Sequence, residues 1–208
     1  MNDVKVVVVY ESMYGNTHLV ADAIAGGLRS VSGVDAEVVV VGHSSAEVLA
    51  GADVVVVGGP THVHGMTRPS TRKAAAEAAA EPDSQLELEP DAEGDGLREW
   101  FDAVEGLPAR AAAFDTRMEG PVVFTGRASK GIAKRLRHHG CEVLDEPRSF
   151  LVTKDNHLEE HEVDEARAWG RRLGVAVTGG QDVDPVPEEM EAAARQELEY
   201  QGDETDEG

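Results

Sequence analysis

Apolar residues gather in short continuous runs along the chain, and amphipathic or polar segments separate them. The five runs are residues 4–10, 36–41, 53–58, 109–114 and 149–153. Most of them are rich in β-branched residues, and none alternates cleanly between apolar and polar positions. Runs of this kind are typical of strands that are buried on both faces of a sheet. The pattern therefore predicts five buried strands.

The segments between the runs have the spacing of amphipathic helices. Val20, Ile24 and Leu28 recur at every fourth position, and Ile132 and Leu136 share this spacing, which places each set on one helix face. A longer stripe recurs at every third or fourth position through Val163, Ala166, Gly170, Leu173 and Val177. Strands that alternate with helices predict an α/β protein with a parallel sheet.

Two further helices are predicted between the third and fourth strands. Residues 71–80 are rich in alanine, and Ser70 after Pro69 is the expected N-cap. Residues 97–104 form the other helix. The segment between them, 81–96, is acidic and contains Pro and Gly, so we expect an excursion at the surface. Residues 179–208 form an acidic tail that is expected to be partly helical or disordered.

Composition places the chain among globular proteins. Its 208 residues suggest one domain with an appendage, and 41% of them are hydrophobic. No apolar run approaches the length of a membrane span, and no basic region followed by an apolar stretch opens the sequence, so a cytoplasmic protein is expected. The single cysteine, Cys141, excludes an intramolecular disulfide and a thiolate metal cluster, and a buried thiol is expected.

The charge of the chain is strongly negative. The formal net charge of −21 comes from 40 acidic and 19 basic residues. Such a field repels the phosphates of nucleic acids and anionic membrane surfaces, so neither is an expected partner. A basic partner would be attracted instead.

The loop after the first run holds candidate chemistry, because ligands of open parallel sheets bind at the carboxyl ends of the strands. Ser12, Asn16 and Thr17 offer side-chain donors there, and Gly15 lets the backbone curl closely. Together with the free amides at a helix start, they would cradle a phosphate. The alternative is an ordinary helix cap by Ser12 or Asn16. The segment has neither the Gly-Lys-Ser/Thr ending of a nucleoside triphosphate loop nor the G-x-G-x-x-G of a dinucleotide fold.

The second loop, residues 58–69, has a backbone path set by glycines and prolines. Thr61, His62, His64 and Met66 would frame a flat aromatic ligand. The two histidines are also a minimal start for a metal site, although no cysteine is near and no further ligands cluster in sequence. The plain alternative is a stiff loop that carries solvated histidines.

A third loop follows the fourth run and contains Asp115, Thr116 and Arg117. These residues either edge the same crevice or are ordinary loop charges. The loop alone leaves both interpretations open.

Taken together, the three loops resemble those of the flavodoxin family. The segment Ser-Met-Tyr-Gly-Asn-Thr at 12–17 is similar to the phosphate loop for flavin mononucleotide (FMN), Ser/Thr-x-Thr-Gly-x-Thr, with Tyr14 in place of the middle Thr. Gly-Gly-Pro-Thr-x-x-x-Gly-Met at 58–66 resembles the second flavin loop, especially that of flavodoxin-like quinone reductases. Phe-Asp-Thr-Arg at 114–117 lies where the third loop belongs.

The resemblance implies a doubly wound, five-stranded parallel sheet with the strand order 2-1-3-4-5 in a domain spanning residues 1–178, and it implies FMN as the cofactor. It places Ser12, Met13, Tyr14, Gly15, Asn16 and Thr17 around the phosphate, with Ser12, Asn16, Thr17 and backbone amides holding it. It places Pro60, Thr61, His62, Val63, His64 and Gly65 along the flavin ring, and Asp115, Thr116 and Arg117 on the ring's other side. No catalytic residue and no metal ligand is assigned.

The resemblance leaves the activity open between several classes. Short electron-carrier flavodoxins usually hold the ring between a Trp and a Tyr, whereas His62 and His64 occupy the second loop here. Trp100 and Trp169 fall on predicted helices and are expected in the core or an interface. The expected function is an FMN protein that carries electrons or acts as a small oxidoreductase, such as an NAD(P)H:quinone reductase, with a redox protein or small acceptor as partner. The alternative is a flavodoxin-like domain without flavin that serves as a binding or regulatory module; the oligomeric state is open.

Overall fold

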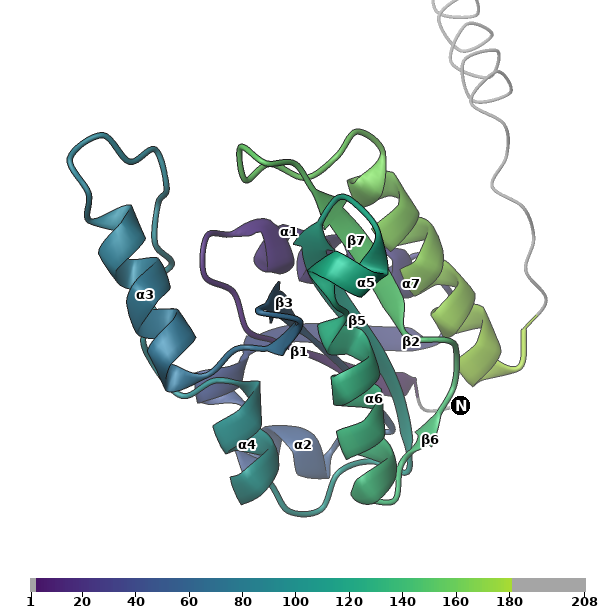
Figure 1. Ribbon diagram of the computed structural model, residues 1–208. Helices are drawn as coiled ribbons and strands as arrows, with labels where there is room; N and C mark the ends of the chain where they lie inside the picture. The colour runs from purple at the N-terminus through teal and green to yellow at the C-terminus, as the bar shows by residue number, and fades with distance from the viewer. Residues whose placement is uncertain (1–2, 181–208) are drawn as a thin grey trace, which may run out of the picture.

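A parallel sheet lies between two layers of helices in the computed structural model, which describes residues 3–180 (Figure 1). Its main strands are β1 (Val4–Tyr10), β2 (Val34–Val40), β3 (Val54–His62), β5 (Arg110–Met118) and β7 (Arg148–Val152). They pair in parallel in the order β2-β1-β3-β5-β7. The predicted fold class and the five predicted strands are therefore confirmed.

The outer edge of the sheet differs slightly from the expected order. A two-residue strand, β6 (Glu142–Val143), pairs with the beginning of β5, whereas β7 pairs with the end of β5. Two segments thus share the outermost position. A second short strand, β4 (Gly65–Met66), turns back antiparallel on the end of β3.

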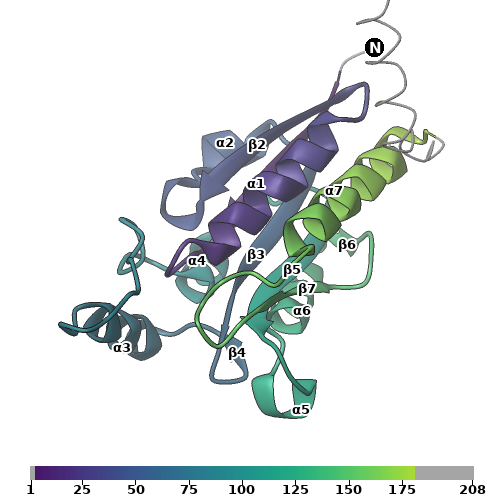
Figure 2. The same cartoon turned by 90° about the horizontal axis from the view of Figure 1, so that it is seen from above.

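Helices cover both faces of the sheet (Figure 2). One face packs against α1 (Asn16–Arg29) and α7 (Glu162–Thr178), and the other packs against α2 (Ala46–Ala50), α4 (Leu97–Ala103) and α6 (Ala128–His138). Successive valines of β1 alternate between the two cores, Val6 and Val8 in one and Val7 and Val9 in the other. This alternation explains why the strand is apolar at every position from Val6 to Tyr10, whereas the exposed Lys5 lies near its start.

The remaining helices are α3 (Pro69–Ala79), the short α5 (Val122–Thr125) and the 3-10 turn η1 (Val41–His43). Trp100, Trp169 and Cys141 are all buried, as the sequence predicts. No helix within residues 3–180 is both long and apolar enough to cross a membrane.

The predicted N-cap of α3 is wrong. The helix begins at Pro69, so Arg68 is the N-cap and Ser70 lies within the first turn. Thr71 Oγ1 accepts a hydrogen bond from the Arg68 amide at 2.8 Å. Proline is favoured at the first helical position because its fixed φ suits the helix and its missing N–H would have no partner there.

Two segments predicted as loops are continuations of strands. β3 runs to His62 and β5 runs to Met118, because Gly59 and Pro60 pair with Asp115 and Thr116. This pairing continues beyond the apolar runs, so hydrophobicity does not mark it.

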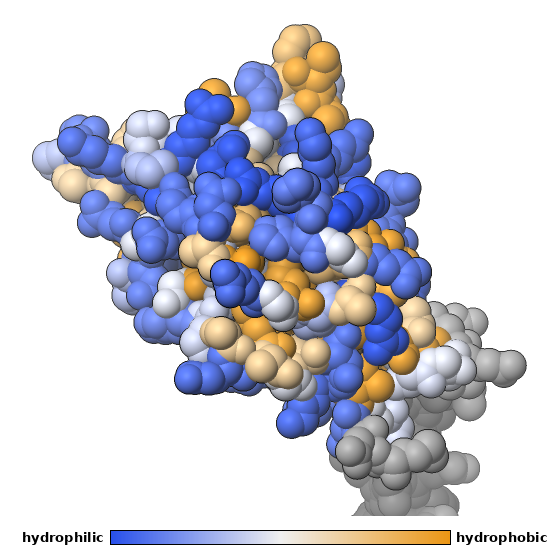
Figure 3. All heavy atoms as spheres, turned by 90° about the horizontal axis from the view of Figure 1, so that it is seen from below, coloured by the Kyte–Doolittle hydropathy of each residue, from blue (hydrophilic) through white to orange (hydrophobic). Residues whose placement is uncertain are grey.

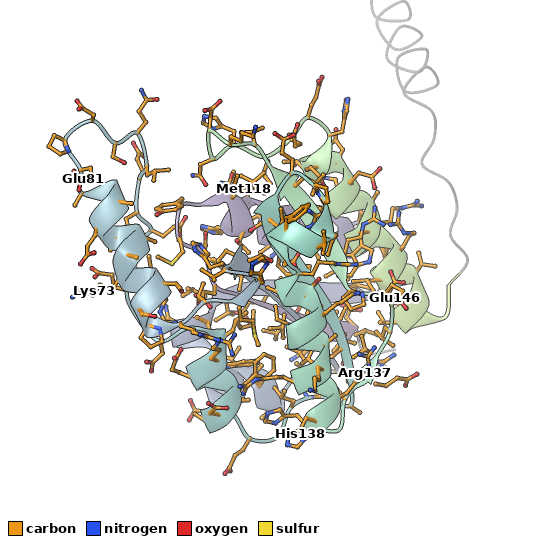
Figure 4. The ribbon with its side chains drawn as sticks, in the orientation of Figure 1. Lys73, Glu81, Met118, Arg137, His138 and Glu146 are labelled. Carbon is orange, nitrogen blue, oxygen red and sulfur yellow. The ribbon has the colours of Figure 1, made fainter. Side chains whose placement is uncertain are left out.

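The acidic segment 81–96 joins α3 to α4 and lies largely at the surface; Figure 4 labels Glu81 at its start. It is not detached from the domain, however. The amide of Glu89 donates to Met13 O at 2.9 Å, and Leu88 and Ala92 pack against Met13 and Ala75. The segment therefore bridges α3 and the loop after β1. Of the predicted acidic tail, residues 181–208 lie outside the described part of the chain.

Candidate functional site

A pocket of about 230 Å³ opens where β1, β3, β5 and β7 end. Its lining residues come from all three predicted loops and from two further segments. They are Ser12, Met13, Tyr14, Asn16, Thr17, Pro60, Thr61, His62, Thr116, Arg117, Met118, Val152 and Asn156. Figure 4 labels Met118 at this end of the sheet. Gly15, Val63, His64, Gly65 and Asp115 are predicted site residues that do not line the pocket.

The turn from β1 into α1 is built to leave backbone amides without partners. Gly15, the N-cap, has a φ of 88° in the left-handed region that favours glycine, and no side chain caps the helix. The first intrahelical hydrogen bond runs from the Leu19 amide to Gly15 O at 2.9 Å, so the amides before Leu19 have no partner inside the helix. Ser12 Oγ accepts from the Gly15 amide at 3.1 Å instead of capping the first turn. The alternative of an ordinary side-chain cap is therefore wrong.

Two side chains of this turn tie it to distant segments. Asn16 Nδ2 donates to the carbonyl oxygen and the Oδ1 of Asn156, at 2.9 and 3.1 Å. The hydroxyls of Thr17 and Thr116 share a hydrogen bond of 2.7 Å. The side-chain amide of Asn16 is thus committed to the loop before α7, whereas one hydroxyl proton of the threonine pair stays available for a ligand.

The end of β3 forms a second wall of the pocket. Burial lowers the pKa of His62 below its usual value, which favours a neutral imidazole beside the pocket. Val63 and His64 form the tip of the hairpin between β3 and β4, both with positive φ, and Val63 is strongly exposed. Within residues 3–180, no group of three or more His, Cys, Asp or Glu side chains is arranged to hold a metal ion.

Asp115 serves a different role from either one that the sequence suggests. It is completely buried, and its Oδ2 accepts from the Ser129 amide at 2.7 Å and from Thr61 Oγ1 at 3.1 Å. The Thr61 hydroxyl in turn accepts from the Ala128 amide at 2.9 Å. Asp115 and Thr61 therefore satisfy the first amides of α6, and Asp115 neither edges the pocket nor sits in a solvated loop.

Arg117 is the cationic residue in the pocket lining. Its Nη1 donates to Met118 O, Gly120 O and Thr125 Oγ1 at 3.0–3.1 Å. Its Nε is buried and has no hydrogen-bond partner. An unpaired buried donor is costly, so an acceptor on a ligand would relieve it.

Sequence reasoning missed several residues of the site. Met118, Val152 and Asn156 line the pocket, but their sequence neighbourhood carries no motif. Glu89 of the segment 81–96 also approaches, with Oε1 3.3 Å from His18 Nδ1. A Cβ at Gly15 would lie 3.4 Å from the same oxygen. A carboxylate thus lies beside the amides at the start of α1.

The carboxylates around this turn affect the pKa of Tyr10. Tyr10 is buried at the end of β1 and stacks on His18, with the ring centroids 4.6 Å apart. Burial, followed by the charges of Glu89, Asp22 and Asp91, raises the pKa of Tyr10 to about 12. The turn therefore lies in a negative field, and an anion that binds there must be held by strong donors.

Comparisons with known proteins agree with the overall fold. A flavodoxin from the domain Archaea has 23% sequence identity and a TM-score of 0.55, over 84% of this chain and 99% of that one. Oxidised Flavodoxin 1 from Bacillus cereus has 21% identity and a TM-score of 0.54, over 86% of this chain and 99% of that one. At these identities, the likeness shows the fold. The comparison with curated proteins gives no match. The family model for flavodoxin matches residues 8–196, so the chain belongs to the flavodoxin family, whose members bind FMN.

Proposed function

We propose that the pocket binds FMN with its phosphate at the start of α1, and that the protein carries electrons or acts as a small flavin oxidoreductase. The observation that carries this proposal is the uncapped start of α1, where Gly15 in the left-handed region leaves amides free at the pocket's edge. A helix start of this kind attracts anions through its amides and its dipole.

The residues present fit the cofactor. The turn supplies hydroxyls and amides, which hold a phosphate without a metal ion. The orphaned Arg117 Nε would donate to a polar atom of the ligand. The sulfur-bearing Met13 and Met118, with Pro60 and Val152, supply apolar walls for a flat ring. When bound, FMN supplies the redox chemistry, and these side chains bind and orient it.

The proposal is tested by titrating the purified protein with FMN and with riboflavin, following visible absorption and flavin fluorescence. The expected result is tight binding of FMN and much weaker binding of riboflavin, which lacks the phosphate. If neither flavin binds, the proposal fails and the chain is a flavodoxin-like binding module. With FMN bound, quinone turnover with a reduced nicotinamide would identify the reductase, and reduction only by an electron-transfer protein would identify the carrier.

Replacing Thr17 with valine is expected to weaken FMN binding by about tenfold to a hundredfold, the loss expected for a hydrogen bond to a charged group. The substitution keeps the shape of the buried side chain and removes only its hydroxyl. Affinity for riboflavin should stay unchanged. Thr116→Val is the matched control, because it breaks the same hydroxyl pair from the other side. An equal loss of FMN affinity in both variants would mean that the two hydroxyls act as a unit, and it would contradict a separate contact of Thr17 with the phosphate.

Replacing Glu89 with glutamine is expected to strengthen FMN binding about fivefold at low ionic strength, since it removes a negative charge beside the phosphate position. The effect stays at about 1 kcal/mol because water screens a partly exposed carboxylate. Glu87→Gln is the control: Glu87 is exposed in the same segment and changes the net charge equally. Identical gains in the two variants would show a general charge effect and contradict a local one.

A further inference from the structure

Helix α6 carries a concentration of positive charge, in contrast to the strongly negative chain as a whole. Its sequence, ASKGIAKRLRH, contains basic residues and no acidic one, although acidic residues outnumber basic ones by 40 to 19 in the chain. Lys130, Lys134, Arg137 and His138 are all exposed. Their spacing places them on one face of the helix. We call these four residues the basic stripe.

The basic stripe is unfavourable for the isolated helix. Like charges four residues apart destabilise a helix by about 0.2–0.5 kcal/mol per pair, which applies to Lys130 with Lys134. The helix dipole favours basic residues in the last turn, where Arg137 and His138 lie, but it disfavours Lys130 in the first turn. Neither local helix stability nor the dipole therefore accounts for the whole stripe.

The positive charges of the stripe are also not neutralised by the rest of the described domain. Within residues 3–180, no carboxylate lies within ion-pair distance of Lys130, Lys134 or Arg137. The neighbouring Arg135 is different, because it pairs with Asp102 of α4 and lies over the ring of Phe101. The stripe is thus open to an anionic partner.

A groove lies beside the stripe, between α4 and α6. It has a volume of about 820 Å³, and its lining includes Phe101, Lys134, Arg137 and His138. Figure 4 labels Arg137 and His138 at the lower end of α6, away from Met118 at the flavin pocket. Figure 3 views the molecule from this lower side, where apolar residues gather centrally among hydrophilic ones. The groove is therefore separate from the proposed FMN site.

The acidic tail of the same chain has the complementary charge. Residues 181–208 contain a single basic residue, Arg195. Their acidic residues are Asp182, Asp184, Glu188, Glu189, Glu191, Glu197, Glu199, Asp203, Glu204, Asp206 and Glu207. A segment of this charge and the basic stripe attract each other, and the attraction is strongest at low ionic strength.

The tail also starts close enough to reach the groove. The carbonyl of Val177, near the end of α7, accepts from Arg110 Nη1 at 3.3 Å. In the sheet, Arg110 of β5 lies opposite Glu142 of β6, the edge strand that follows α6 in the chain. The end of α7 and the end of α6 therefore flank the same sheet edge. Residues 181–208 can span up to roughly 90 Å, whereas α6 is about 16 Å long.

We propose that the acidic tail, residues 181–208, docks on the basic stripe of α6 and in the adjoining groove of its own molecule. The carboxylates of the tail pair with Lys134 and Arg137, and covalent attachment raises their local concentration well above that of a separate acidic protein. The tail thereby neutralises the repulsion between the positive charges of the stripe.

A zero-length carbodiimide cross-link on the full chain tests this proposal, because it joins only amines and carboxylates in contact. The lysines are Lys5, Lys73, Lys130, Lys134 and Lys154. Mass spectrometry should find tail carboxylates joined to Lys134 and Lys130, with yields that fall in molar salt. The pair Lys73–Glu77, 3.8 Å apart, should cross-link in every sample and thus verifies the reagent.

Three outcomes would overturn the proposal. The first is a Lys73–Glu77 link without any link from the tail to the stripe. The second is an equal distribution of tail links over all five lysines. The third is a predominance of links between isotopically light and heavy chains in a mixed sample, which would place the tail on a second copy or show an intermolecular encounter.

A charge reversal tests the stripe without removing its amines. Arg137→Glu is expected to lower the yield of the link between Lys134 and the tail at least fivefold. Arg172→Glu, at an exposed position of α7, changes the net charge equally and should leave the yield unchanged. Equal losses in the two variants, with melting temperatures that show both are folded, would contradict a specific docking surface.

Discussion

Replacing Gly27 with alanine is expected to lower the melting temperature of the protein by several degrees, whereas replacing the adjacent Gly26 raises it. A Cβ at Gly27 would lie 1.9 Å from the carbonyl oxygen of Arg167, so α1 and α7 would have to separate. Overpacking of this kind costs about 1–3 kcal/mol, and each kcal/mol shifts the melting temperature by roughly 2–4 °C in a domain of this size.

The neighbouring position supplies the control for this prediction. A Cβ at Gly26 would meet nothing closer than Arg167 Nε at 4.0 Å, so alanine gains helix propensity of up to about 1 kcal/mol without a clash. Gly170→Ala should behave like Gly27→Ala, because its Cβ would lie 2.1 Å from Ile24 O on the opposite side of the contact. Thermal unfolding followed by circular dichroism measures all three. Equal stability of Gly26→Ala and Gly27→Ala would mean that the helices do not approach this closely.

The close contact between α1 and α7 also shows where sequence reasoning stops. The apolar spacing of Val20, Ile24 and Leu28 predicts the buried face of α1, and that face is found in the core. The spacing does not say which helix lies across from it. Gly27 and Gly170 are far apart in the sequence. The backbone of the opposite helix leaves no room for a Cβ at either position, and this constraint becomes visible only when both helices are placed.

The candidate site likewise has one part that local sequence predicts and another part that depends on distant contacts. The turn at residues 12–17 was predictable because its geometry depends on local features: the end of a buried strand, a glycine in the left-handed region and the start of a helix. The roles of Asp115, Asn156 and Glu89 depend on contacts made across the fold. The position of Asp115 directly after an apolar run predicted a loop. In the structure, Asp115 lies within β5 and accepts a hydrogen bond from the Ser129 amide of α6.

The second large effect is expected at a buried polar cluster that joins β1, α3 and α4. Glu11 Oε2 accepts from the Leu97 amide at 2.9 Å, and its Oε1 accepts from the Thr67 hydroxyl. Arg72 Nη1 donates to Thr67 Oγ1 at 3.3 Å, and Arg72 Nη2 pairs with Glu99 Oε2 at 3.2 Å. Glu11, Thr67 and Arg72 are all buried. The cluster therefore ties the start of α3 and the end of the excursion 81–96 to Glu11, next to the proposed phosphate turn.

Replacing Arg72 with methionine is expected to destabilise the protein by about 3–5 kcal/mol, because it leaves carboxylates without their buried cation. Denaturant unfolding measures the loss. Lys73→Met is the matched control at the adjacent position, where an exposed lysine pairs with Glu77 and the expected change stays below about 1 kcal/mol. If the two variants unfold at the same denaturant concentration, the cluster does not hold the domain together as described.

The partners of Arg72 allow a sharper test of the same cluster. In the Arg72→Met background, Glu99→Gln removes the charge that lost its partner, so it should recover part of the lost stability. In the native background, the same substitution should cost stability because it breaks the pair with Arg72. A double-mutant cycle isolates this coupling. Because Glu11 immediately precedes Ser12, Arg72→Met should also weaken FMN binding, whereas Lys73→Met should not. A stable domain with weakened FMN binding would assign the cluster to the site rather than to the fold.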